Sequence, residues 1–228
     1  MHLTIIAKAP EPGRVKTRLS PPCTPAEAAS VAAAALADTV DAVDAAAAAV
    51  AIITTGRAPP VRRVVLLDGA PGEWVPSCYD VVVQRGRGLA ARLANGFADL
   101  GPGVIVGMDT PTAGRWLANA LLAVTAGDDV LGLASDGGYW MIGLARVDGQ
   151  VFDGIPMSRS DTGLAQLRRL HALGRSVRLL PMARDLDDEA DLRAHARAEG
   201  PGRLAPVARS IVERLGEPVG SPVARRSR

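Results

Sequence analysis

Residues 8–18 concentrate charge that could bind phosphate, and they come directly after the first apolar run of the chain. Four cationic side chains share this segment with one acid and with Gly13, which would let the backbone approach a phosphate group closely. Lys16 and Arg18 could neutralise the charge of a diphosphate. The segment lacks the Walker A pattern, because Gly13 stands only three residues before Lys16, and its single glycine excludes the dinucleotide fingerprint. A phosphate-binding loop and a solvated basic loop both remain open.

Asp109 is a second candidate, because it follows the apolar run 104–108 and precedes Thr110. In an open α/β sheet, a carboxylate at the carboxyl end of a strand points into the crevice where ligands bind. Oxygen ligands suit Mg²⁺ or Mn²⁺, which proteins usually hold through one or two carboxylates together with substrate phosphates. Asp109 could instead cap a helix, and its position alone does not separate the two interpretations.

The next apolar run ends in a similar way, in the sequence Asp136, Gly137, Gly138, Tyr139 and Trp140. Two glycines after an acid would allow the backbone to approach a ligand, and an aromatic ring could stack on it. The alternative is a tight hairpin turn with both aromatic side chains in the core.

Residues 185–189 form an acidic cluster before an expected helix. Acids at a helix N-terminus complement the helix dipole, which is sufficient reason for such a cluster. Metal binding by Asp185 and Asp187 is the other interpretation, and local sequence favours the helix terminus over it.

Composition favours a small anionic ligand over a nucleic acid. The 228-residue chain has a net charge of only +2, and its basic residues gather in two short clusters, residues 8–18 and 85–92. No GxSxG or HExxH motif occurs, and Cys23 and Cys78 lack metal-ligand spacing, so serine hydrolases and zinc enzymes are poor fits. We expect no nucleic-acid partner, and we expect His195 on a solvated helix face.

The chain begins directly with an apolar strand pattern and shows no secretion signal. The longest nearly apolar stretch, residues 42–53, is interrupted by Asp44 and is too short to cross a bilayer. These features predict a cytoplasmic protein with no membrane span.

Short β-branched runs alternate with amphipathic stretches, a pattern that predicts an α/β fold with a mostly parallel sheet. We expect one domain over residues 1–215 and a disordered basic tail over 216–228. Thr24 and Glu27 predict the start of an Ala-rich helix. The expected strands are residues 3–7, 50–55, 64–67, 80–84 (short and buried), 104–108, 129–133 and 177–180; the expected helices are residues 24–48, 89–100, 113–126, 160–174, 185–200 and 204–215.

Five motifs, read in order, resemble a bacterial family. They are AKAPEPGRVKTRL (7–19), QRGRGLAARL (84–93), GMDTPT (107–112), SDGGYWMIGL (135–144) and DLDDEADL (185–192). The chain resembles the DUF2064-like, GT-A-type glycosyltransferase-like proteins of unknown function, which are related to MobA-like nucleotidyltransferases and 2-phospholactate guanylyltransferases. The chain departs from the family pattern at Met108, Ala90 and Asp188.

This resemblance implies a three-layer α/β/α, Rossmann-like GT-A fold of the nucleotide-diphospho-sugar transferases, and it assigns roles to residues. It implies Asp109, Asp185 and Asp187 as ligands of Mg²⁺ or Mn²⁺. Lys16 and Asp136 are our catalytic candidates, and Asp136 is the candidate base. The implied acceptor-binding residues are Asp136, Gly137, Gly138 and Tyr139. The implied nucleotide-binding residues are Ala7, Lys8, Ala9, Pro10, Gly13, Lys16, Arg18, Gln84 and Arg92.

The leading hypothesis is a metal-dependent transferase, foremost a glycosyltransferase that uses a nucleotide-sugar and a small-molecule acceptor. One alternative is a nucleotidyltransferase that acts with a nucleoside triphosphate on a small phosphorylated acceptor. Another is a non-catalytic nucleotide-binding protein. The sequence leaves the oligomeric state open.

Overall fold

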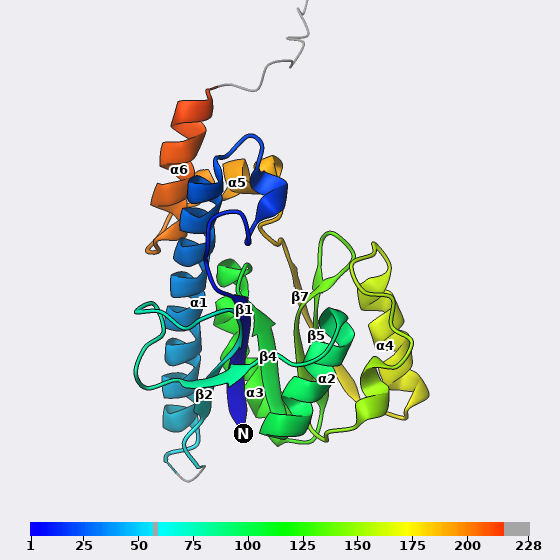
Figure 1. Cartoon of the computed structure of the whole chain (residues 1–228). Helices are drawn as coiled ribbons and strands as arrows, with labels where there is room; N and C mark the ends of the chain where they lie inside the picture. The colour runs from blue at the N-terminus through cyan, green and yellow to red at the C-terminus, as the bar shows by residue number, and fades with distance from the viewer. Residues whose placement is uncertain (57–58, 217–228) are drawn as a thin grey trace, which may run out of the picture.

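The computed structural model describes residues 1–56 and 59–216, in which seven strands form one sheet (Figure 1). The strand order is β3-β2-β1-β4-β6-β5-β7. Strand β6 runs antiparallel to its neighbours β4 and β5, and the other pairings are parallel. The predicted mostly parallel α/β class is therefore confirmed. The strands are β1 (His2–Lys8), β2 (Arg62–Asp68), β3 (Asp80–Val83), β4 (Gly103–Gly107), β5 (Asp129–Ala134), β6 (Tyr139–Leu144) and β7 (Val177–Ala183).

Helices cover both faces of this sheet and complete a three-layer α/β/α arrangement. Helices α1 and α3 pack on one face, and α2 and α4 pack on the other. The α-helices are α1 (Pro25–Ile53), α2 (Gly88–Leu100), α3 (Leu117–Thr125), α4 (Thr162–Ala172), α5 (Glu189–Ala196) and α6 (Leu204–Leu215). Short 3-10 helices are η1 (Thr17–Leu19), η2 (Pro111–Trp116) and η3 (Gly149–Phe152).

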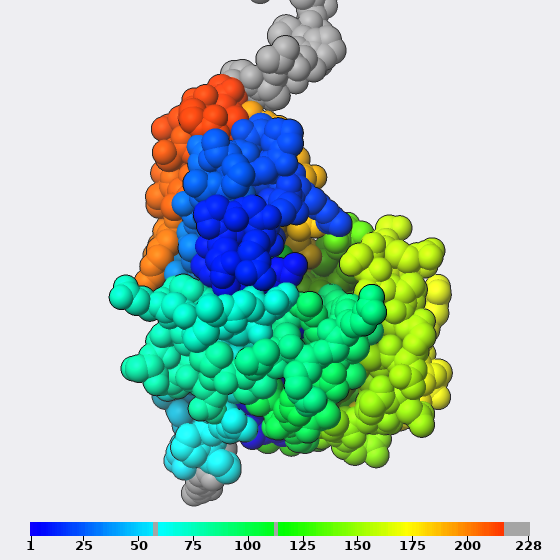
Figure 2. Space-filling view, viewed as in Figure 1, coloured from blue at the N-terminus to red at the C-terminus, as the bar shows by residue number. Residues whose placement is uncertain are grey.

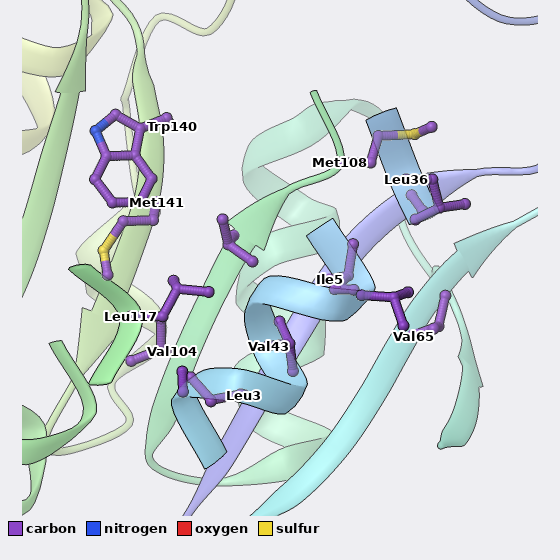
Figure 3. Packing of buried hydrophobic residues seen from close by; sticks show 14 of the residues in the cluster. Leu3, Ile5, Leu36, Val43, Val65, Val104, Met108, Leu117, Trp140 and Met141 are labelled. Atoms are coloured by element: carbon purple, nitrogen blue, oxygen red, sulfur yellow. The ribbon is translucent and has the colours of Figure 1, made fainter. Parts of the chain in front are cut away.

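Alternation along the strands sorts side chains between the two faces. Leu3 and Ile5 of β1 meet Val43 of α1 and Val104 of β4 in the core beneath α1 and α3 (Figure 3). Side chains two residues apart on a strand share one face, so this regular spacing fills one layer. Burial of such aliphatic groups is the main source of stability for the sheet.

Helix α1 begins where the sequence predicts. The hydroxyl of Thr24 accepts from the backbone N–H of Glu27, and the Glu27 carboxylate accepts from the backbone N–H of Thr24. The predicted strand 50–55 is wrong, because α1 continues to Ile53. Val43, Ala46 and Val50 are buried at helical spacing, so packing on the sheet outweighs the β-branched character of the helix end.

A second hydrophobic core lies beyond the carboxyl ends of the parallel strands, where α5 and α6 sit in Figure 1. It joins the first half of α1 to these two helices. Leu19 and Cys23, from the segment after β1, are buried in it. We call this group the cap core; its buried members are Leu19, Cys23, Ala28, Val31, Ala34, Ala35, Leu186, Leu192, Ala196, Leu204, Ala208 and Ile211.

Two other expectations need correction. Strand β3 is an exposed edge strand, with Val83 66% exposed, because only β2 pairs with it. His195 is buried, because it shares the packed face of α5 with Leu192 and Ala196. The predicted tail from residue 217 onward lies outside the described residues, and the single domain stays a prediction. Within residues 1–56 and 59–216 no helix is long and apolar enough to cross a membrane.

Candidate active site

The strand order reverses between β1 and β4, and in open α/β sheets ligands bind beyond the carboxyl ends of strands at such a point. A cavity of about 610 Å³ opens there, which is within the usual size range of ligand pockets. Figure 2 shows the surface hollowed between the blue N-terminal segment and the yellow-green segment that contains α4. We call this the first cavity; the predicted site residues that line it are Ala7, Lys8, Lys16, Arg18, Gln84, Arg92, Asp109, Tyr139, Asp185 and Asp187.

Lys16 is held between the two hydrophobic cores. Val15 is buried in the sheet core and Leu19 in the cap core, so the loop is anchored on both sides of Lys16. The backbone of Lys16 is left-handed (φ 49°), a conformation that costs a non-glycine residue energy. Its side chain is only 6% exposed. The sequence alone shows a basic loop, whereas the structure buries this one ammonium group.

The Lys16 Nζ donates to Asp109 Oδ2 at 2.7 Å and to the carbonyl of Leu186. Asp187 Oδ1 lies 3.8 Å from the same nitrogen. Residues from the loop after β1, the end of β4 and the segment after β7 therefore meet at one ammonium group. The segment that carries Asp185 and Asp187 therefore lies beside Asp109, and their role as metal ligands stays a prediction.

The segment after β7 is fixed to the end of β4 by two hydrogen bonds. Leu186 N–H donates to the Asp109 carbonyl at 3.2 Å, and the Thr110 hydroxyl donates to Asp185 Oδ1 at 2.7 Å. Asp188 caps α5 by accepting from the N–H of Asp191 at 2.9 Å. The acidic cluster therefore has two functions: Asp188 satisfies the helix terminus, while Asp185 and Asp187 face the cavity.

Asp185 is the carboxyl group whose proton affinity changes most at this site. Burial, and then the negative charge of Asp109, raise the pKa of Asp185 to about 7. No Lys, Arg or His side chain in the described parts of the chain forms an ion pair with it. A cation beside Asp109 and Asp185 would relieve this repulsion.

The donor set fits Mg²⁺ or Mn²⁺ held by two protein carboxylates plus ligand phosphates. It does not form a complete protein cage, because the described residues contain no group of three metal-ligating side chains at metal distance. One of the two Asp109 oxygens is also occupied by Lys16. Asp187 is already paired with Arg18 at 2.5 Å, so Asp109 and Asp185 fit a metal ion better than Asp187 does.

Gln84 and Arg92 line the first cavity, but their side chains already form hydrogen bonds within the protein. The Gln84 amide donates to the carbonyls of Ala7 (2.8 Å) and Leu66 (2.9 Å). Arg92 Nη1 donates to Gln84 Oε1 at 2.8 Å and to Asp68 Oδ2 at 2.7 Å. The hydrogen bond from Arg92 keeps the pKa of Asp68 below its usual value. Gln84 therefore links the ends of β1 and β2. Arg92 is held in place through Nη1, and the N–H groups of its Nε and Nη2 form no hydrogen bond with the described residues.

The segment from Asp136 to Gly138 is the turn of the β5–β6 hairpin, so the hairpin alternative is correct for the backbone but not for both aromatic side chains. Ala134 N–H donates to the Gly138 carbonyl at 3.0 Å. A Cβ on Gly137 would lie 1.9 Å from the Ser160 carbonyl, so Gly137 allows the turn to contact the segment before α4. The Trp140 ring is buried in the core, whereas Tyr139 reaches the cavity.

The turn still faces a hollow, because Asp136, Gly138 and Tyr139 line a second cavity of about 700 Å³. This second cavity shares a wall with the first. The shared residues are Arg18, Leu89, Tyr139, Ser158, Asp185 and Asp187.

Four predicted site residues line neither cavity: Ala9, Pro10, Gly13 and Gly137. Ala9 is buried, and its N–H donates to the Asp68 carbonyl at 2.9 Å. Gly13 has φ +76° with open space around it, so its backbone conformation rather than a close approach requires glycine.

Sequence reasoning missed Asp68 and Thr110, which hold Arg92 and Asp185 respectively. Asp68 ends a strand just as Asp109 follows one, so the rule that selected Asp109 could have found it. Nothing local to Thr110 marks its partner, which lies 75 residues away.

Comparison with known proteins identifies the family. The sequence profile of a family described as "Uncharacterized protein conserved in bacteria (DUF2064)" matches residues 39–159, more than half of the chain. The chain belongs to this family. The DUF2064 match includes Gln84, Arg92, Asp109 and the turn at Asp136 but ends before Asp185, and it begins after Lys16. No curated protein sequence matches this DUF2064 protein significantly.

A crystal structure from Desulfovibrio desulfuricans G20, provisionally named a nucleotide-diphospho-sugar transferase, has a similar fold. The TM-score is 0.74 at 23% identity, and the match covers 92% of this chain and 95% of the other. The predicted nucleotide-diphospho-sugar transferase fold is therefore confirmed. A structure of CMP:2-keto-3-deoxy-manno-octonic acid synthetase with CTP, at 13% identity over 94% of this chain and 97% of the other, reaches a TM-score of only 0.40 and carries no argument.

Proposed function

We propose that this DUF2064 protein is a metal-dependent glycosyltransferase that uses a nucleotide-sugar donor. The observation that carries the proposal is the Lys16–Asp109 ion pair, which faces the first cavity at the reversal point of strand order. A buried cation beside carboxylates is the arrangement expected where a diphosphate and its metal ion meet the protein.

Each charged group has a proposed role. Lys16 and Arg18 bind the diphosphate and stabilise the charge that develops on it as the leaving group departs. Asp109 and Asp185 would hold Mg²⁺ or Mn²⁺, which supplies further charge neutralisation when bound. Lys16 can donate to a phosphate oxygen while it keeps Asp109 and the Leu186 carbonyl, because one ammonium group has three protons to donate.

Asp136 is the proposed general base. It lies in the second cavity, where Oδ1 accepts from Gly138 N–H at 2.8 Å and the other oxygen has no hydrogen bond to the described residues. An acceptor hydroxyl in this cavity could therefore transfer its proton to Asp136 while the first cavity holds the donor. Two adjoining cavities support transfer between two small molecules.

A thermal-shift panel of nucleotides and nucleotide-sugars, with and without Mg²⁺ or Mn²⁺, tests the binding site. A ligand at a hundred times its Kd should stabilise the protein by about 2.7 kcal/mol. We expect a metal-dependent shift that Asp109→Asn removes. Asp80→Asn is the matched control, because Asp80 forms an exposed ion pair with Arg62 at 2.9 Å on the edge strand. An unchanged shift in Asp109→Asn would place the ligand elsewhere.

The released product decides the reaction. Free nucleoside diphosphate supports glycosyl transfer, whereas pyrophosphate released from a nucleoside triphosphate identifies the nucleotidyltransferase alternative. Binding without turnover of either donor class identifies a non-catalytic nucleotide-binding protein.

A further inference from the structure

The two cavities differ in charge although they share a wall. Residues that line only the first cavity include three cationic side chains, Lys8, Lys16 and Arg92, and one acid, Asp109. Residues that line only the second include two arginines and three acids; they are Arg159, Arg184, Asp136, Asp188 and Asp191. The shared wall adds one arginine and two acids to both.

The arginines of the second cavity are already paired. Arg18 donates to Asp187 Oδ2 at 2.5 Å, and Arg159 to Asp161 Oδ1 at 3.2 Å. Arg184 Nε donates to Asp191, which is more than half buried. An anionic acceptor would have to break the pair of Arg159 or Arg184 to gain a cation, and Arg18 in the shared wall is assigned to the donor diphosphate, so the arginines offer the acceptor little.

Some carboxylate oxygens and hydroxyls of the second cavity, in contrast, have no partner among the described residues. In the described parts of the chain Asp136 and Asp188 form no ion pair, and Oδ2 of each accepts no hydrogen bond, while Oδ1 accepts one from a backbone N–H. The hydroxyls of Ser135 and Ser160 also line the cavity without a hydrogen bond to other described residues. Carboxylates accept hydrogen bonds from ligand hydroxyls, and serine hydroxyls can either donate or accept them.

We propose that the second cavity binds a neutral, hydroxyl-rich acceptor and discriminates against phosphorylated acceptors. The assignment rests on the proposed function in one respect, namely that the ligand of this cavity is the acceptor. Its charge preference rests on the cavity alone. The first cavity has more cationic than acidic lining residues and binds the anionic donor. The charges of the two cavities therefore direct donor and acceptor to different cavities.

Engineered cysteines test the charge preference without knowledge of the acceptor. In a Cys78→Ser background, which removes the exposed native thiol, Ser160→Cys reports on the second cavity and Thr17→Cys on the first. Each thiol is treated with a cationic, a neutral and an anionic methanethiosulfonate of similar size. At Ser160→Cys we expect the cationic reagent to react about tenfold faster than the anionic one, and at Thr17→Cys we expect the opposite order.

Asp188→Asn and Asp136→Asn should each reduce the cationic preference at Ser160→Cys, while the exposed Asp80→Asn should leave it unchanged. The second readout is protection of that cysteine, in the presence of nucleoside diphosphate, by glycerol, glucose and their monophosphates. We expect the neutral polyols to protect at lower concentration than their phosphates.

Equal rates for the two charged reagents, faster reaction of the anionic one, or better protection by the phosphates would each overturn the assignment. Lack of protection by every neutral polyol would also overturn it. Failure of the proposed function looks different: the reagent preference would persist while no nucleotide shifted the melting temperature.

Discussion

Each end of the sheet holds an ion pair whose cation is buried, and the two pairs differ in what surrounds them. At the amino end, Arg175 and Asp129 lie 3.2 Å apart and are 5% and 2% exposed. Arg175 Nη1 also donates to the Arg146 carbonyl at 2.8 Å, and Asp129 Oδ1 accepts from Ala145 N–H at 2.8 Å. The chain itself therefore satisfies both charged groups.

At the carboxyl end, Lys16 and Asp109 lie 2.7 Å apart, and Asp109 keeps 32% of its side chain exposed to the first cavity. Asp185 lies beside them with a raised pKa and no cationic partner among the described residues. Charge that the protein satisfies by itself stabilises the fold. Charge that faces a cavity and lacks a full set of partners remains available to a ligand.

Arg175→Met should produce the largest loss of stability. It leaves Asp129 buried without a counter-charge, and breaking a buried pair in this way costs about 3–5 kcal/mol. Urea denaturation measures the change. Arg178→Met is the matched control, because Arg178 pairs with Asp128 at the surface and should contribute under about 1 kcal/mol. Equal losses in the two variants would contradict the comparison, as would weaker nucleotide binding by folded Arg175→Met.

His2, also at the amino end, should make the fold sensitive to acid. It is buried, with Nε2 3.1 Å from the Gly101 carbonyl and Nδ1 2.8 Å from the Thr4 hydroxyl. Burial lowers the pKa of His2 from 6.5 to about 4. Between these values the unfolded chain binds a proton that the folded chain does not, so stability falls as pH falls. From pH 7.5 to pH 5 this group should remove about 2 kcal/mol.

Urea denaturation of the wild type and of His2→Gln at both pH values measures this contribution. Glutamine can both donate and accept but does not titrate, so the variant should lose about 2 kcal/mol less than the wild type over the same interval. An identical pH dependence in both proteins would show that His2 does not stay neutral in the folded state.

The sequence predicts local structure well where one signal dominates. Helix α6 has the predicted bounds, and the capping pattern of Thr24 and Glu27 correctly starts α1. The predicted strand at residues 50–55 failed because propensity competes with packing, and packing on the sheet extends α1. The exposure of β3 depends on its place at the sheet edge, which no local pattern reveals.

The candidate site depends even more on tertiary structure, which local sequence patterns do not show. Residue types and their places after strands were enough to select Lys16 and Asp109, whereas Asp185 was selected as a metal ligand through the family resemblance. Their contacts join positions 93 and 75 residues apart, so only the folded topology shows that Lys16 is bonded to Asp109 or that Thr110 holds Asp185. The hydrogen bonds from Gln84 to two backbone carbonyls likewise depend on the tertiary structure.

Thr110→Val should have a moderate effect at the carboxyl end. Valine keeps the shape of this buried side chain but removes the hydroxyl that donates to Asp185 Oδ1 at 2.7 Å. Leaving a buried acceptor unsatisfied costs about 1–3 kcal/mol, and metal-dependent nucleotide binding should weaken as Asp185 loses its orientation. Thr125→Val is the control, because its hydroxyl donates to the Leu121 carbonyl within α3 at 2.8 Å, away from the carboxyl end of the sheet. A normal metal-dependent shift in Thr110→Val would argue against a role for Asp185.

Lys16→Met should have the smallest effect on stability and a large effect on ligand binding. The aliphatic part of methionine can occupy the space of the buried lysine stem, and Asp109 remains partly hydrated in the cavity, so we expect a loss of about 1 kcal/mol, below that of Arg175→Met. Nucleotide affinity should fall at least tenfold, because a charge-assisted hydrogen bond contributes about 1.5–3 kcal/mol.

The matched control is Lys8→Met, since Lys8 and Lys16 are the two lysines of the chain and both line the first cavity. Lys8 is exposed and forms no ion pair with the described residues, so its loss removes the same charge without removing a positioned contact. A fall of only a few-fold is expected there. If both variants weakened binding equally, general charge would account for the effect, and the buried position of Lys16 between the two cores would have no special part in holding the ligand.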